Sequence, residues 1–345
     1  MKEYVEFRIP EKHASRFLAS HEGKRLSDTV RALEVAVDDP RYEWIGNLQH
    51  RLRREGEFFF LGWEIKRRYL RKEVESAELF HLYITATFEP AGEQCGTVYD
   101  DSMACPFCGA GRKQVSDLVL DLRKVPKSKD IARTIADEWI VSQRLAEILV
   151  GAKMTGFELR PVQHKARYED DPVDFSKVPS GRELLQRAKE AGLNPVTTNW
   201  EFIIWLNRPE QDELAERARK EHSELLGRLA RRRPKPTPMW YQLVVTSKPV
   251  PVVPPTRFGI APFDEDPEGL YRCPCGHVSG LNLLSELWVP RAAWDGSDIA
   301  RTENMVGIRR GLLMPTPLLL ISPRFWRLLR AEKVKGYKVE VAHLV

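Results

Sequence analysis

Two short cysteine segments are the residues whose types and spacing favour a definite chemistry. They are Cys105-Pro106-Phe107-Cys108-Gly109 and Cys273-Pro274-Cys275-Gly276-His277, and each reads as a zinc knuckle, a tight turn with a thiolate on either side. The glycine after the second cysteine lets the backbone N–H groups turn back toward the sulfurs. Because a closed structural zinc site takes four ligands, the sequence predicts one structural Zn²⁺ held by both knuckles together, through Cys105, Cys108, Cys273 and Cys275.

The second knuckle leaves an alternative open. It is Cys-x-Cys rather than Cys-x-x-Cys, and His277 follows it directly, so this imidazole is an alternative ligand in place of one thiolate. A redox role for the Cys105 and Cys108 pair is the rival interpretation, although it does not account for a second knuckle. A catalytic zinc is not expected, because four thiolates leave no open position for water. The fifth cysteine, Cys95, is expected to be a buried or unpaired thiol.

Other chemistry is hard to find in the chain. There is no Gly-rich phosphate loop with a lysine, no dinucleotide-binding glycine motif, no His-Glu-x-x-His and no nucleophile elbow. An acidic group at 169–174 is most simply a solvated loop. We therefore assign no catalytic and no cofactor-binding residue, and the sequence does not support an enzyme.

The elements that must position the knuckles divide into four segments. The 345 residues, 42% of them hydrophobic, favour two or three units. We expect an α+β fold with an N-terminal α/β segment at 1–90, a first knuckle half at 91–167, a mostly helical insertion at 168–240 and a second knuckle half at 241–345. In the first segment, Asp39-Pro40 begins a helix that ends at Gly56, and Phe58–Trp63 and Leu79–Phe88 are expected strands.

An internal similarity relates the two knuckle halves. Residues 140–162 match 320–342 without gaps at an offset of 180, with five identities in 23 positions and apolar residues in both segments at six further pairs. The identical pairs are Ser142/Ser322, Arg144/Arg324, Leu149/Leu329, Lys153/Lys333 and Gly156/Gly336. Each half is expected to run strand, Ser-capped helix, Gly turn, strand. We interpret the halves as two pseudo-repeated α/β units joined by the knuckle pair.

Charge and hydropathy bound the location and the partners. No apolar run approaches the 18–20 residues that span a bilayer, and the N-terminus lacks a secretory signal, so a cytoplasmic protein without membrane contact is expected. The net charge of +5 is a mild excess. Basic clusters at 51–72 and 231–235 suit phosphate contacts, but neighbouring glutamates favour a solvated, balanced face for the first of them.

With a Cys-Pro-x-Cys-Gly knuckle in the first half and a shortened one in the second, the chain over about 95–345 resembles the bacterial double-CXXCG motif family. Some members of that family are linked to self-protection against toxins delivered between neighbouring cells. The resemblance implies a zinc-stabilised protein-binding module, an immunity protein that neutralises a bacterial toxin by stoichiometric occlusion. The alternative is a zinc-ribbon protein that binds nucleic acid through the basic clusters.

Overall fold

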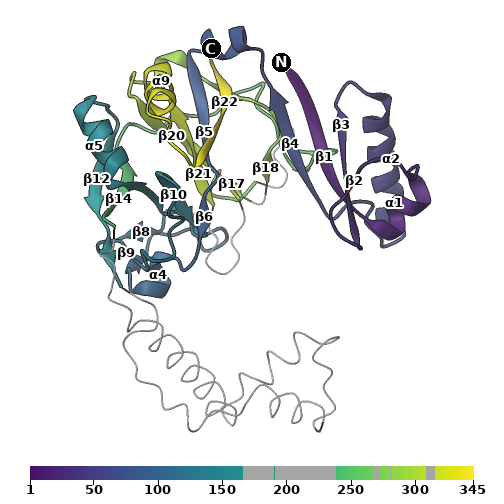
Figure 1. The fold of residues 1–345 in the computed structure, drawn as a ribbon, viewed down its shortest axis with the longest axis horizontal. Helices are drawn as coiled ribbons and strands as arrows, with labels where there is room; N and C mark the ends of the chain where they lie inside the picture. The colour runs from purple at the N-terminus through teal and green to yellow at the C-terminus, as the bar shows by residue number, and fades with distance from the viewer. Residues whose placement is uncertain (166–189, 191–237, 267–271, 280, 308–314) are drawn as a thin grey trace.

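A computed structural model describes residues 1–165, 190, 238–266, 272–279, 281–307 and 315–345, which form a mixed α+β fold made mostly of strands (Figure 1). The helical insertion expected at 168–240 lies outside these residues, apart from Glu190 and 238–240. Within the described part of the chain, no helix has both the length and the apolarity needed to cross a bilayer.

The N-terminal sheet is antiparallel, with the strand order β2-β3-β1-β4. Its strands and helices are β1 (Lys2–Pro10), α1 (Glu11–Phe17), β2 (Lys24–Arg25), β3 (Val30–Ala36), α2 (Pro40–Arg54) and β4 (Gly62–Arg68). The two helices pack on one face of the sheet over a core that includes Phe7, Ile45 and Phe59. This segment lies to one side of the larger sheets in Figure 1.

The sequence locates α2 correctly but not β4. Asp39 caps α2 by accepting a hydrogen bond from the backbone N–H of Arg41 at 2.8 Å, and the helix ends at Arg54. The strand expected at Phe58–Trp63 is wrong, because β4 begins only at Gly62. Phe59 lies before the strand and is fully buried; its backbone N–H donates to the side chain of Gln49 at 2.7 Å. The apolar run is therefore explained by core packing rather than by strand pairing.

Two further sheets make up most of the rest. The middle sheet has the order β12-β14-β11-β10-β6, and the C-terminal sheet has the order β17-β20-β21-β5-β22-β19. The middle elements are β6 (Thr87–Phe88), β10 (Ile131–Thr134), β11 (Trp139–Ser142), α5 (Gln143–Gly151), β12 (Phe157–Pro161) and β14 (Trp240–Val245). The C-terminal elements are β5 (Leu79–Ile84), β17 (Val278–Ser279), β19 (Leu287–Val289), β20 (Ile299–Gly307), β21 (Thr316–Ile321), α9 (Pro323–Ala331) and β22 (Tyr337–Leu344).

The segments 140–162 and 320–342 adopt corresponding local structures. The hydroxyl of Ser142 accepts a hydrogen bond from the backbone N–H three residues further on at 3.2 Å, and Ser322 does the same at 3.0 Å. Each serine thereby caps its helix, α5 or α9. Lys153 and Lys333 both have φ of 50°. The apolar faces of both helices lie in one shared core cluster between the two sheets.

The contacts between the two segments are also reciprocal. Arg144 donates to the backbone carbonyl of Glu332 at 3.2 Å, and Arg324 donates to the carbonyl of Ala152, the position that corresponds to Glu332 at the offset of 180. Asp130 accepts from the backbone N–H of Lys335 at 2.9 Å, and Asp298 accepts from that of Thr155 at 3.0 Å. The two aspartates thus hold the turn of the opposite segment.

Strands β5 and β14 occupy matching central places in the two sheets but belong to the opposite parts of the chain. β5 precedes the middle-sheet strands in sequence, yet it pairs with β21 and β22 of the C-terminal sheet. β14 precedes the C-terminal strands β20–β22, yet it pairs with β11 and β12 of the middle sheet. Residues 79–84, which the sequence division puts in the N-terminal segment, are therefore the centre of the last sheet.

Short elements connect these layers. They are α3 (Arg71–Glu75), α4 (Gly92–Cys95), β7 (Tyr99–Asp100), β8 (Lys113–Gln114), β9 (Val119–Leu120), β13 (Gln163–His164), β15 (Phe258–Ala261), β16 (Asp264–Glu265), β18 (Asn282–Leu283) and a 3₁₀ helix at Arg291–Ala293. The β7–β8 pair is antiparallel and carries the first knuckle between its strands. The second knuckle lies directly before β17.

Candidate metal centre

The two knuckles meet in space. The Sγ atoms of Cys105, Cys108, Cys273 and Cys275 all lie within 4.8 Å of one another. Cys105 Sγ is 3.5 Å from Cys273 Sγ, and Cys108 Sγ is 3.5 Å from Cys275 Sγ. These distances exceed the length of a disulfide bond, about 2.05 Å. They are close to the edge of a tetrahedron of thiolates around a metal, about 3.8 Å for metal–sulfur bonds of about 2.3 Å.

Local backbone geometry forms both turns. Gly109 and Gly276 have φ of 74° and 87°, in the left-handed region that glycine adopts without strain. In the first knuckle, Cys105 donates its N–H to the carbonyl of Ala110 at 2.7 Å. In the second, Cys273 donates its N–H to the carbonyl of His277 at 3.1 Å. Each turn is closed by its own backbone, so each presents two thiols in a fixed direction.

The backbone also biases the protonation of the thiols. The backbone N–H groups of Cys108 and Phe107 donate to the Cys105 sulfur and lower the pKa of Cys105 to about 6. The N–H of Cys108 makes the largest contribution. Burial instead raises the pKa of Cys108 to about 12. Burial also raises the pKa of Cys273. A cation among the sulfurs would favour the thiolate form of all four, which is how such a cluster binds a metal and releases protons.

The cluster is only partly covered. Cys108 and Cys273 are buried, Cys105 is half-buried and Cys275 is exposed. The sulfurs pack against Ala110 and against Met305 of β20, and this contact ties the β7–β8 arm to the C-terminal sheet. Four protein thiols in one closed group suit a site that holds two chain segments together.

The remaining sequence candidates lie elsewhere. His277, the alternative ligand, is outside the group of metal-ligating side chains, and the contact that it makes to the knuckle is through its backbone carbonyl. Cys95 is buried at the end of α4 and is also outside the group. Among the described residues, the four cysteines are the one cluster of this kind.

Large apolar side chains are exposed along the β7–β8 arm, a feature that the sequence reading missed. Residues 98–115 include Val98 and Val115, each 55% exposed, Phe107 at 71% and Met103 at 85%. Phe107 belongs to the knuckle turn itself. The sequence signal for this exposure is the presence of large apolar residues in a turn-rich segment that is too short to bury them in a core of its own.

Most of the first basic cluster is already paired with acids. Arg53 binds Asp264 at 2.8 Å and Lys66 binds Glu6 at 2.6 Å. The other ion pairs of this cluster join Arg67 to Glu3 and Glu340, Arg68 to Glu34, and Arg71 to Glu75. This pairing agrees with a balanced face. The second basic cluster, 231–235, lies outside the described residues.

Comparison of the chain with protein-family models, with curated proteins and with solved structures finds no match in any of the three.

Proposed function

We propose that the four cysteines hold one structural Zn²⁺ and that the chain is a protein-binding module built around it. The observation that carries the metal is the group of four Sγ atoms within 4.8 Å, contributed by two separate knuckles. Tetrahedral thiolate sites select zinc or iron, and zinc is the metal of closed structural knuckles. Elemental analysis of the purified protein tests this, with one zinc per chain expected and iron as the contradicting result.

We infer that the two knuckle halves are pseudo-repeats whose seam is the metal centre. The reciprocal contacts of Arg144 and Arg324 support this, as do the matching strand orders β12-β14-β11-β10 and β22-β5-β21-β20. Each unit contributes one knuckle. The metal therefore has an architectural task, which is to fix the knuckles of two similar units to each other.

The exposed apolar side chains on the β7–β8 arm support a protein partner. Methionine and phenylalanine are enriched at protein interfaces, and the metal fixes the arm that carries them. Met103 and Phe107 are more exposed than any other large apolar side chain of the described residues. Together with the resemblance to the double-CXXCG family, this favours an immunity protein that occludes a bacterial toxin.

Affinity purification from the native host tests the proposal. We expect the wild-type protein to recover one specific protein in stoichiometric amount, and a Met103→Ser/Phe107→Ser variant to lose it while keeping its zinc. Val150→Ser is the matched control, because Val150 is 66% exposed on α5, away from the arm, and should leave recovery unchanged. Equal recovery by all three proteins, or recovery of none, would contradict the proposal.

The toxin is tested separately. A gene that encodes a toxin beside the gene of this protein is the candidate partner, and co-expression should restore growth of cells that produce that toxin. The nucleic-acid alternative is less favoured, because Arg53, Lys66 and Arg67 are held by carboxylates of the same chain. Steeply salt-dependent retention on DNA or RNA would reverse that preference.

A further inference from the structure

A cleft separates the N-terminal sheet from the C-terminal sheet, and none of the four clustered cysteines lines it. Its volume is about 920 Å³, within the range of about 300–1,000 Å³ usual for small-molecule sites. One wall is β4 with the loop before it, and the opposite wall is formed by β5, β21 and β22. Residues of α2, β15, β16, β18, β20 and the β10–β11 hairpin complete the lining.

Every charged side chain of the described lining is matched by an opposite charge. The four ion pairs are Arg67 with Glu340, Arg53 with Asp264, Arg133 with Asp137, and Lys338 with Glu64. Arg67 and Glu340 form the deepest pair, with side chains that are 2% and 7% exposed. The other three pairs are more exposed. The walls therefore offer no unpaired charge to a ligand.

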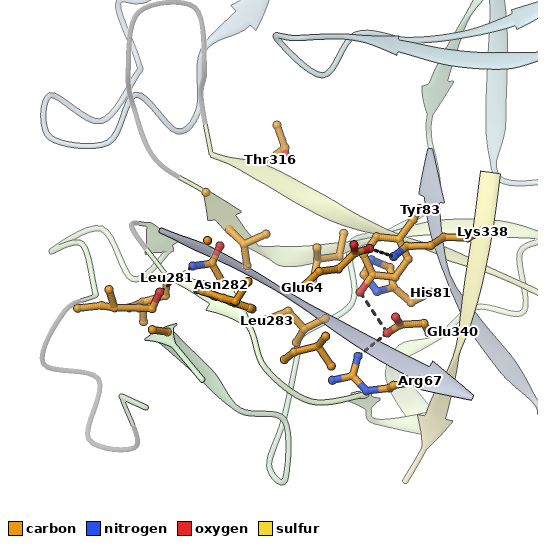
Figure 2. Close-up of a pocket in the computed structure, with 18 of the residues that line it drawn as sticks. Glu64, Arg67, His81, Tyr83, Leu281, Asn282, Leu283, Thr316, Lys338 and Glu340 are labelled. Atoms are coloured by element: carbon orange, nitrogen blue, oxygen red, sulfur yellow. Dashed lines mark hydrogen bonds and ion pairs between the residues drawn. The ribbon is translucent and has the colours of Figure 1, made fainter. Parts of the chain in front are cut away.

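One end of the cleft is polar and holds two of these ion pairs, Arg67 with Glu340 and Lys338 with Glu64, beside two uncharged rings. Figure 2 shows Arg67, His81, Tyr83, Lys338 and Glu340 gathered at one end of the cleft. Burial lowers the pKa of His81 to about 3, so this imidazole is neutral at physiological pH. Burial also raises the pKa of Tyr83, whose hydroxyl donates to Glu340 at 3.2 Å.

Much of the rest of the surface is apolar, with Asn282 and Thr316 as further polar lining residues. Trp63 and Ile65 line the cleft from β4, and Leu281 and Asn282 lie at the end opposite the polar group in Figure 2. Phe58 and Leu61 also line the cleft and are 55% and 69% exposed. The lining combines apolar side chains with a polar group at one end.

We propose that this cleft binds an uncharged small molecule with a largely aromatic or aliphatic body. The paired charges favour an uncharged ligand. A charged ligand would lose its hydration, and every opposite charge in the lining already forms an ion pair. An apolar ligand would instead gain free energy by burying its surface against Trp63, Ile65 and Leu283. This site shares no residue with the cysteine cluster or with the β7–β8 arm.

Two dyes that share one skeleton test the charge selectivity. N-phenyl-1-naphthylamine is neutral, and 8-anilinonaphthalene-1-sulfonate carries the same rings with one added sulfonate. Titrated into the full chain, the neutral dye is expected to bind saturably at one site, and the anionic dye at least about tenfold more weakly, because its charge gains no partner. Absence of saturable binding, or equal or tighter binding of the sulfonate, would overturn the proposal.

Two exposed leucines give a matched pair of variants. Leu61 and Leu70 are each 69% exposed, so substituting either one disturbs no core. Only Leu61 lines the cleft. Leu61→Glu is expected to weaken binding of the neutral dye about fivefold by placing a carboxylate at the mouth, and Leu70→Glu to leave it unchanged. Equal effects of the two substitutions would show that the dye binds elsewhere.

Tryptophan fluorescence locates the dye independently. Trp63 lines the cleft and transfers excitation energy to a bound naphthylamine, so dye binding should quench the protein emission. Trp63→Phe keeps an aromatic wall, and we expect it to retain the dye while reducing this quenching. Unchanged quenching in Trp63→Phe would place the dye away from β4 and overturn the assignment.

Discussion

His81 shows how the environment of one residue sets a property of the whole protein. It lies in β5 opposite Glu340 on one side and Leu320 on the other, and it is 3% exposed. Desolvation, with Arg67 and Lys338 nearby, lowers its pKa to about 3 from the usual value of 6.5. The unfolded chain therefore binds a proton in a pH range where the folded protein does not.

Stability should consequently fall with acidification. The contribution of His81 is fully present above about pH 6.5 and is lost as the pH falls toward 3, by about 1.4 kcal/mol per unit. Between pH 7 and pH 5 we expect His81→Gln to lose about 2 kcal/mol less free energy of unfolding than the wild type. Glutamine is the residue that occupies the matching place in β14, at Gln242. His21→Gln, an exposed position, is the control, and denaturant titration is the measurement.

Gly336 is a second residue whose type is dictated by its surroundings. Its φ is 111°, and a Cβ there would lie 2.1 Å from the carbonyl oxygen of Ile131. Gly96 has nearly the same φ, 110°, but no atom within 4 Å of such a Cβ. We expect Gly96→Ala to cost about 1 kcal/mol of stability from backbone strain, and Gly336→Ala about 3 kcal/mol or more. Equal costs, measured by chemical denaturation, would show that the close contact is relieved without penalty.

At the scale of elements, each knuckle is closed by its own backbone, and the two together bring four thiols within reach of one metal ion. Replacing Cys105 with serine removes one thiolate, so we expect the bound zinc to fall from one per chain to near none and the midpoint of unfolding to fall with it. Cys95→Ser alters a cysteine outside the cluster and should retain the metal. A Cys105→Ser protein that keeps both its zinc and its stability would contradict the site.

These elements also show which features are accessible from the sequence. The knuckles, the start of α2 at Asp39-Pro40 and the serine caps of α5 and α9 depend on neighbours within a few residues, and all are found where the pattern puts them. The prediction of a strand at Phe58–Trp63 is wrong because an apolar run indicates that side chains are buried, but not that the backbone pairs with another strand. The cleft has no sequence signal, since Trp63, His81 and Leu283 come from three different elements.

At the scale of the whole molecule, the two larger sheets exchange strands: β5 pairs within the C-terminal sheet and β14 within the middle sheet. A protease site introduced after residue 200 would leave β5 in the first fragment and β14 in the second, each inside a sheet whose other strands all belong to the other fragment. We expect the cleaved pieces to remain associated. Fragment 201–345 expressed separately should lack a cooperative transition.

The result that would contradict this arrangement is a cooperative unfolding transition in fragment 201–345 alone, since fragment 1–200 also contains the N-terminal sheet with a core of its own. Such a transition would mean that β14 can pair with the strands that follow it. The midpoint of the cleaved and uncut proteins, compared by thermal denaturation, measures how much of the association comes from the strands and how much from chain continuity.

The exchange of β5 and β14 has a consequence for biosynthesis. During translation β5 emerges long before its partners β21 and β22 are made. Until then, the apolar face that β5 contributes to the shared core has no native cover, so we expect the nascent chain to expose an aggregation-prone strand over that interval. The long sequence separation of these pairs also makes the fold one of high contact order and slow formation. Chaperone association with the nascent chain, measured by ribosome profiling, should therefore persist until the C-terminal strands are made.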